Sequence, residues 1–316
     1  MSDLRWGYAI NQWDGPRREQ QERALKSMSV CGFRAVELEV GSGRFATLGR
    51  PELIELNFGS LKNFTDFLKA CGVDQVASVF YDPGMVSQEE DSLGRNPANP
   101  AEHKGIVEAL RPFAKFLHDV GGQCLVVRPM QSYWKEAPVT EAKIRCAAEC
   151  WNTVGRMTKN DYGIATVLHP DFVCAIHTID DIGTILNSTD PEFVGLAIDT
   201  AELTVAGVNP AEVYRRYQNR VRHFHFKDTR NVDHLGEYKR INADSELRAD
   251  GGEKNVERWF WEMGTDGGLV DFRALTQTIR KNGYEGWIIV ESDTSPHPAE
   301  SVMLNAYYVK YFLDRA

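Results

Sequence analysis

Short apolar runs and longer amphipathic stretches alternate along the whole chain. At several places an amphipathic stretch ends in a glycine, as at Gly72 and Gly163, and an apolar run follows within a few residues. Glycine favours the left-handed conformation that ends many helices, and short runs rich in β-branched and aromatic residues are typical of strands. The pattern therefore predicts alternating helices and strands.

Eight apolar runs have the length and composition of strands, and they begin at Trp6, Phe33, Val73, Gln123, Ile164, Phe193, Val221 and Tyr284. Helical periodicity covers residues 17–31, 51–70, 102–119, 140–159, 178–187, 210–218, 272–282 and 298–313. Strands that alternate with helices favour a parallel sheet joined by crossovers. We therefore predict an α/β protein with a closed (β/α)8 TIM barrel.

A doubly wound open sheet is the alternative architecture. It would carry a glycine-rich nucleotide-binding turn after the first strand, where this chain has Asn11-Gln12-Trp13-Asp14. The sequence therefore favours the barrel.

The length of 316 residues fits two ordinary domains or one large barrel. Because the strand count fits the barrel, we expect residues 1–316 to form a single domain. Two long segments, 82–100 and 229–270, follow strands. We expect both to lie over the active-site face as lids or substrate walls.

The chain is acidic, with 36 Lys+Arg against 45 Asp+Glu and a formal net charge of −9. Nucleic-acid binding relies on a basic surface, so we expect no nucleic-acid partner. We also expect no membrane span, because no apolar run approaches about eighteen residues. The six cysteines are scattered and the first residues lack a signal-peptide pattern, which predicts a soluble cytoplasmic protein.

Polar side chains end the last four predicted strands, at the face where barrel enzymes hold their active sites. Strand alternation directs one side chain of each toward the mouth of the barrel: His169, Asp199, His225 and Glu291. A mixed set of nitrogen and oxygen donors suits a divalent cation. We predict that these four residues bind one divalent metal ion, with His169 in contact with substrate as the alternative. His223 lies one layer deeper, and we expect it to be a packed core histidine.

Several stretches resemble the xylose isomerase-like barrels of the sugar phosphate isomerase/epimerase group, and within it most closely the inosose dehydratase-like proteins. The stretches are L-H-P-D-F from Leu168, V-G-L-A-I-D-T-A-E-L-T from Val194, V-R-H-F-H-F-K-D from Val221 and G-Y-E-G-W-I-I-V-E from Gly283. The resemblance implies a divalent metal, Mn²⁺ or Co²⁺ ahead of Mg²⁺ or Zn²⁺, held by Asp199, His225 and Glu291. It also implies that Lys227 and Asp228 form part of the substrate wall.

This chain departs from the group at two positions. Isomerases and epimerases of the group place a glutamate on strand five, where this chain has I-A-T-V-L-H and no carboxylate. The dehydratases usually have D-T-G-H at strand six, whereas this chain has Asp199-Thr200-Ala201-Glu202. Glu202 either acts as an acid or base beside the substrate or lies in the first turn of an exposed loop.

A cation that chelates a ketone and its neighbouring hydroxyl stabilises the enediolate formed when the α-proton leaves. Loss of a β-hydroxyl then gives dehydration, and reprotonation gives epimerisation. The predicted catalytic residues are His169, Glu291, Lys227 and Glu202.

Other strand ends supply predicted substrate contacts. Arg128 either holds a polar or anionic substrate group or forms a surface salt bridge at the rim. Trp13 either stacks on a sugar ring or packs in the core. Of Glu37 and Glu39, one is expected to line the mouth and the other to be solvated, and we assign Glu39 to the substrate together with Asp228.

We predict a metal-dependent lyase that acts on a keto-polyol or keto-sugar by α-proton abstraction and β-elimination. The alternatives are a ketose 3-epimerase or sugar isomerase, the catalytic subunit of a C-glycoside deglycosidase, and a non-catalytic sugar-binding barrel. The expected partner is a small sugar or polyol. Whether the protein forms a homo-oligomer or binds a small partner subunit is left open by the sequence.

Overall fold

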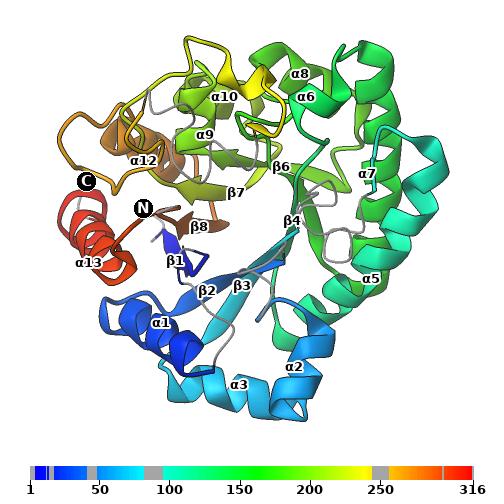
Figure 1. The fold of residues 1–316 in the computed structure, drawn as a ribbon. Helices are drawn as coiled ribbons and strands as arrows, with labels where there is room; N and C mark the ends of the chain where they lie inside the picture. The colour runs from blue at the N-terminus through cyan, green and yellow to red at the C-terminus, as the bar shows by residue number, and fades with distance from the viewer. Residues whose placement is uncertain are drawn as a thin grey trace.

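Parallel strands close into a barrel at the centre of the protein, and helices surround it (Figure 1). The structure is a computed structural model that describes residues 4–11, 13, 18–40, 48–81, 95–243, 256–293 and 295–314. The strands are β1 (Arg5–Ala9), β2 (Ala35–Val40), β3 (Gln75–Tyr81), β4 (Cys124–Val127), β5 (Ala165–Leu168), β6 (Val194–Asp199), β7 (Val221–Phe226) and β8 (Trp287–Val290). Each strand pairs in parallel with the next, and β1 pairs with β8 to close the ring. The predicted (β/α)8 barrel is confirmed.

Helices connect the strands around the outside of the barrel (Figure 1). They are α1 (Arg18–Val30), α2 (Pro51–Phe58), α3 (Leu61–Ala70), α5 (His103–Val120), α6 (Tyr133–Glu136), α7 (Glu141–Tyr162), α8 (Ile179–Ser188), α9 (Thr200–Val205), α10 (Pro210–Tyr217), α12 (Phe272–Lys281) and α13 (Pro298–Tyr308). The short 3-10 helices η2 (Pro100–Glu102) and η3 (Glu237–Lys239) and the π-helical turn η4 (Val309–Leu313) complete the described elements.

The prediction of one helix over 51–70 is wrong. Gly59 adopts a left-handed conformation with φ 73°, which ends α2, and the Ser60 side chain accepts a hydrogen bond from the Asn63 N–H to begin α3. The apolar periodicity continues across this break, so the pattern alone did not reveal it. The short helices α6 and α9 were also not predicted.

Side chains alternate between the inside of the barrel and its helix-covered outside. On β2, Val36, Leu38 and Val40 belong to the hydrophobic core shared with the helices. Two further clusters fill the interior of the barrel, and they consist of Ala9, Ala35, Ala77, Trp287 and Ile289, and of Cys124, Val126, Val167 and Ala197. Small residues suit the crowded barrel axis, and the polar residues described below lie among the same inward-facing positions.

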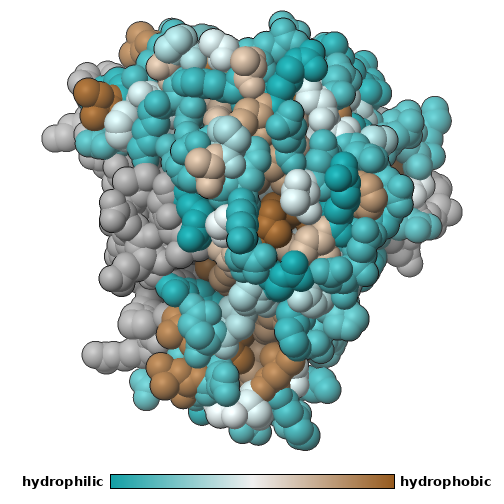
Figure 2. Space-filling view, turned by 90° about the vertical axis from the view of Figure 1, so that its right-hand side faces the viewer, coloured by the Kyte–Doolittle hydropathy of each residue, from teal (hydrophilic) through white to brown (hydrophobic). Residues whose placement is uncertain are grey.

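The outer helices present polar residues to solvent. Figure 2 shows that the face over α5 and α7 is mostly hydrophilic. The apolar side chains of α5, among them Ile106, Leu110 and Phe113, are buried against the barrel. Among the described residues, no helix has both the length and the apolar character that a membrane crossing requires.

The two long segments after strands are described in part, because residues 82–94 and 244–255 lie outside the described residues. Within the second segment, Trp261 pairs with Asp228 in an antiparallel bridge at the end of β7. Trp259 and Phe260 are buried in a cluster with Phe172 and Ala201, which follow β5 and β6. This part of the segment therefore packs on the carboxyl ends of the strands.

Candidate functional site

Three of the four predicted ligands form a tight group at the carboxyl ends of β5, β6 and β7. One donor atom each from His169, Asp199 and His225 lie within 4.8 Å of one another. Asp199 Oδ2 is 3.3 Å from His169 Nε2 and 3.6 Å from His225 Nδ1. All three side chains are buried. Glu291, after β8, borders this group, since its Oε2 is 2.9 Å from His225 Nδ1.

The two oxygens of Asp199 have different tasks. Oδ1 accepts hydrogen bonds from the backbone N–H groups of Ala201 and Glu202 and so caps the start of α9. Oδ2 is the oxygen that faces His169 and His225. The helix start therefore fixes the carboxylate and leaves one oxygen directed at the group of imidazoles.

Lys227 is 1% exposed and lies among four carboxylates. Its ammonium nitrogen is 2.5 Å from Asp293, 2.9 Å from Glu291, 3.1 Å from Asp199 and 3.5 Å from Glu202. The ring of Phe260 covers the ammonium, with 4.2 Å from Nζ to the ring centroid. Burial and Glu291 raise the pKa of Asp293 to about 7. Even with Asp293 protonated, the other carboxylates outnumber the ammonium, which favours the binding of a further cation.

The charged groups shift one another's pKa values. Burial works against the charged form of Lys227, but Asp199, Asp293 and Glu291 raise its pKa well above the usual range. Burial also opposes ionisation of Asp199, yet Lys227 and His169 hold its pKa below the usual range. The lysine therefore stays protonated and the aspartate stays ionised at neutral pH.

Glu202 is buried, so the alternative that it lies in an exposed loop is wrong. Its Oε2 accepts a hydrogen bond from the backbone N–H of Phe172, and its Oε1 faces Lys227. The first turn of α9 thus directs this carboxylate into the site. The structure brings His169, Glu202, Lys227 and Glu291, the four predicted catalytic residues, to one end of the barrel.

Arg128 is buried, so the alternative of a surface salt bridge at the rim is wrong. The guanidinium is 1% exposed, and its Nε is 2.7 Å from Asp171 Oδ2. Asp171 Oδ1 also accepts from the N–H groups of Val173 and Cys174. This pair holds the loop that follows His169, and contact of Arg128 with a substrate stays a prediction.

Asp228 points into the long segment after β7. Its Oδ1 accepts hydrogen bonds from the backbone N–H groups of Thr229, Leu269 and Val270. A Cβ added at Gly268 would lie 2.1 Å from Asp228 Oδ2, so glycine at this position makes room for the carboxylate. Asp228 therefore anchors both ends of the segment, and its predicted contact with a substrate stays a prediction.

The remaining predicted contacts lie at the mouth of the barrel. Glu39 on β2 is half-buried, and burial, Glu291 and Asp293 raise its pKa well above the usual range. Its contact with a substrate stays a prediction. Trp13 is partly buried and packs against the hydrophobic core, and its stacking on a sugar stays a prediction. Phe80 lines the site, with its ring centroid 5.1 Å from that of His169.

Three residues of the site were not predicted as functional. Glu37 is fully buried and contacts both histidines of β7. Glu39 is half-buried, so neither glutamate of β2 is the solvated one that was expected. Asn11 donates hydrogen bonds to Glu291 and Asp293, and Asp293 contacts Lys227. Asp293 lies two residues beyond Glu291, so the alternation used for the other strands could have found it.

The donor atoms fit a divalent cation of intermediate hardness. Two imidazole nitrogens and an aspartate oxygen meet in one group, a glutamate borders it, and the carboxylates around it exceed the positive charge. Imidazole and carboxylate together suit Mn²⁺, Co²⁺ or Zn²⁺, and no thiolate belongs to the group.

A parallel barrel with such a group at the carboxyl ends of its strands has the architecture of a barrel enzyme. The chain matches the family described as xylose isomerase-like TIM barrel over residues 25–306, and it belongs to this family. It is similar to inosose dehydratase of Clostridium beijerinckii, with 29% identity over 302 residues that cover 92% of this chain and 88% of the relative.

Two solved structures show the same fold. A sugar phosphate isomerase/epimerase from Parabacteroides distasonis has a TM-score of 0.69 at 16% identity and covers 99% of both chains. A structure described as IOLI protein with a binding zinc atom has a TM-score of 0.66 at 14% identity, with 98% of this chain and 99% of that chain covered. The predicted resemblance is confirmed, and so is the predicted class, an enzyme of the lyase or isomerase kind.

Proposed function

We propose that this protein is a divalent-metal-dependent lyase that removes water from a keto-polyol or keto-sugar by α-proton abstraction and β-elimination. The observation that carries this proposal is the tight group of His169, Asp199 and His225 beside the buried ammonium of Lys227. Relatives named inosose dehydratase, one of them similar over 92% of the chain, support the same reaction class.

His169, Asp199, His225 and Glu291 are the residues that would hold the metal ion, which we propose to be Mn²⁺ or Co²⁺, with Mg²⁺ and Zn²⁺ as alternatives. Such an ion polarises a ketone and so acidifies the neighbouring C–H bond. The protein contributes a preorganised and buried set of donors, since Asp199 is fixed by α9 and His225 by contacts on both ring nitrogens.

Lys227 and Glu202 are the groups that we propose for proton transfer. The Lys227 ammonium can donate a proton to the leaving hydroxyl, and the neighbouring Glu202 carboxylate can accept the α-proton. Phe260 covers Lys227, and the aromatic cluster around it excludes water from this end of the site. Elimination needs both an acid and a base, and this pair supplies them 3.5 Å apart.

The end of β5 favours elimination over epimerisation by two glutamates. That strand places His169 at the site, and the acidic residue that follows it, Asp171, is engaged with Arg128. A second carboxylate base on strand five is therefore absent from the described residues.

The proposal is tested by measuring metal content and then incubating the protein with inososes, ketohexoses and 3-keto-glycosides. We expect one divalent ion per chain and a dehydrated product that absorbs as an enone or diketone. Glu291→Gln is expected to lower turnover by two or more orders of magnitude, since it weakens one ligand and one partner of Lys227. Glu192→Gln, at an exposed glutamate on the outside of the barrel, is the matched control and should keep full turnover.

Each alternative has its own signature in this experiment. A product with the mass of the substrate would indicate an epimerase or isomerase, and release of an aglycone from a 3-keto-C-glycoside would indicate a deglycosidase. Sugar binding without turnover would indicate a non-catalytic barrel. A chain that binds no stoichiometric metal, or Glu291→Gln with unchanged turnover, would overturn the proposed mechanism.

A further inference from the structure

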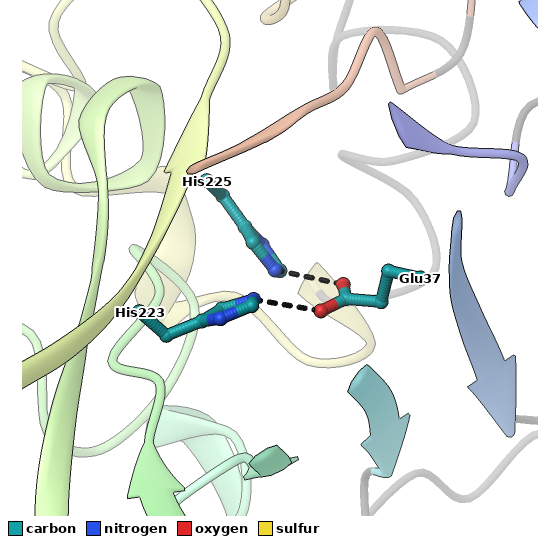
Figure 3. A group of neighbouring side chains, drawn as sticks. All are labelled: Glu37, His223 and His225. Atoms are coloured by element: carbon teal, nitrogen blue, oxygen red, sulfur yellow. Dashed lines mark hydrogen bonds and ion pairs between the residues drawn. The ribbon is translucent and has the colours of Figure 1, made fainter. Parts of the chain in front are cut away.

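A second buried cluster lies inside the barrel and touches the ligand group from within. It consists of Glu37 on β2 and of His223 and His225 on β7, and these side chains point toward one another across the barrel (Figure 3). Glu37 and His223 are 0% exposed and His225 is 2% exposed. Burial of an ionised carboxylate costs free energy unless the charge is paired or hydrogen-bonded. The partners of Glu37 therefore indicate its role.

Each oxygen of Glu37 lies within ion-pair distance of one histidine of β7. Oε1 is 2.8 Å from His225 Nε2, and Oε2 is 2.9 Å from His223 Nε2. Oε2 also accepts a hydrogen bond of 2.6 Å from the Ser78 hydroxyl. A register shift between β2 and β3 places Ser78 directly opposite Glu37, so a local irregularity of the sheet serves this contact. His223 and Ser78 thus hold the carboxylate in one orientation.

The contact with Glu37 divides the two ring nitrogens of His225 between two tasks. Nε2 faces Glu37, whereas Nδ1 faces Asp199 and Glu291, the side on which the other predicted ligands lie. A histidine that binds a metal ion through one nitrogen commonly donates the N–H of its other nitrogen to a carboxylate, which fixes its tautomer and ring orientation.

We propose that Glu37 is a positioning residue that keeps the proton of His225 on Nε2 and so directs the Nδ1 lone pair at the metal ion, with His223 and Ser78 as its supports. This inference rests on the proposed function, because it assigns a metal ion to the group that contains His225. It also gives His223 a purpose beyond core packing, since its Nε2 bonds to Glu37.

Glu37, His223 and His225 are also close enough to bind an ion of their own. The positioning role is favoured because Glu37 already contacts Nε2 of both histidines and the hydroxyl of Ser78. The number of ions bound per chain distinguishes the two arrangements: one ion is expected for the positioning role, and two if this cluster binds its own ion.

The test compares the full-length wild-type chain with Glu37→Gln, which keeps the shape of the side chain and removes its charge. Affinity for Co²⁺ and Zn²⁺ is measured by competition with a chelator, and we expect a loss of about 10- to 100-fold in Glu37→Gln. Proton NMR of histidine-labelled protein should show a downfield, slowly exchanging His225 Nε2–H signal in the metal-free and the Zn²⁺-loaded wild type. This signal should move upfield and exchange faster in Glu37→Gln, because a neutral amide oxygen is a weaker acceptor than a carboxylate.

Two further variants keep the test decisive if Glu37→Gln folds poorly. Ser78→Ala removes one support of Glu37 and should weaken metal binding by a smaller factor. Thr166→Val removes a buried hydroxyl of β5 that bonds to Thr158 of α7, on the helix-covered side of the sheet. This control should leave metal affinity and the His225 signal unchanged.

The inference is overturned if folded Glu37→Gln binds Co²⁺ as tightly as the wild type, or if the wild type binds two ions and Glu37→Gln binds one. It is also overturned if the Nε2–H signal of His225 is absent from the wild type. If the wild type binds no metal but shows the signal, and Glu37→Gln shifts the signal upfield, the proposed function is overturned and the contact between Glu37 and His225 is established.

Discussion

Lys227 holds a full positive charge in a position that is closed to water. Four carboxylates and the face of Phe260 surround its ammonium group. The removal of one partner from a buried ionic cluster leaves uncompensated charge, which costs more than the removal of a surface pair.

We therefore expect Lys227→Met to lower the free energy of unfolding of the metal-free protein by about 3–5 kcal/mol, because the carboxylates then repel one another. The measurement is denaturant unfolding in the presence of a chelator. Lys115→Met is the matched control, since Lys115 is exposed and pairs with Asp119 on the surface, and it should change stability little. Equal stability of both variants would contradict this account.

The residues that could be predicted from the sequence are those whose direction follows from strand alternation alone. Strand alternation located the four predicted ligands, because each lies at or next to the carboxyl end of a strand and its side chain is directed at the barrel axis. They are His169, Asp199, His225 and Glu291. Arg128 and Asp228 also end strands, but their partners come from other segments of the chain. Such long-range contacts leave no signal in the local pattern.

The segment after β7 is held at both ends by hydrogen bonds to one buried side chain, Asp228. Asp228 accepts three backbone N–H groups from the two ends of the segment and is 2% exposed. Burial raises the pKa of Asp228 to about 6, although these N–H groups oppose the shift. The folded protein therefore retains a proton on this carboxyl group at pH values where the unfolded chain has lost it.

This raised pKa predicts that the stabilising contribution of protonated Asp228 is complete below about pH 4 and is lost as the pH rises through about 6. The change amounts to about 3 kcal/mol, since one pKa unit corresponds to about 1.4 kcal/mol. Asp228→Asn can still accept the N–H groups and does not titrate, so its stability relative to the wild type should increase between pH 4 and pH 7. Chemical unfolding at a series of pH values measures this difference, and parallel curves would contradict it.

At the level of elements, the sequence located every strand that the structure describes and most of the described helices, because glycine stops and short β-rich runs are local signals. The break at Gly59 was missed because the apolar face of the helix resumes after it in nearly the same phase. Helices α6 and α9 are too short to show a period. The capping carboxylate of α9, Asp199, was instead recognised only as a ligand.

The whole molecule should be stabilised by the ion that its ligand group fits. A ligand that binds only the folded state adds about 2.7 kcal/mol of stability at a free concentration of 100 times its Kd. We expect Co²⁺ or Mn²⁺ at that level to raise the Tm of the chelator-treated protein by several degrees, as measured by calorimetry. Asp199→Asn should lose this increase yet keep the cap of α9, because an asparagine oxygen also accepts the N–H groups. An equal increase in both proteins would place the ion elsewhere.

The closure of the ring between β1 and β8 makes the two halves of the chain depend on each other. The four proposed ligands come from the second half, whereas Asn11 and Glu37, which contact Glu291 and His225, come from the first. If the gene were split between β4 and β5, each fragment would expose two unpaired sheet edges. The second fragment alone carries all four proposed ligands, so a gain in its metal affinity on addition of the first fragment, which supplies Asn11 and Glu37, would report on their reassembly.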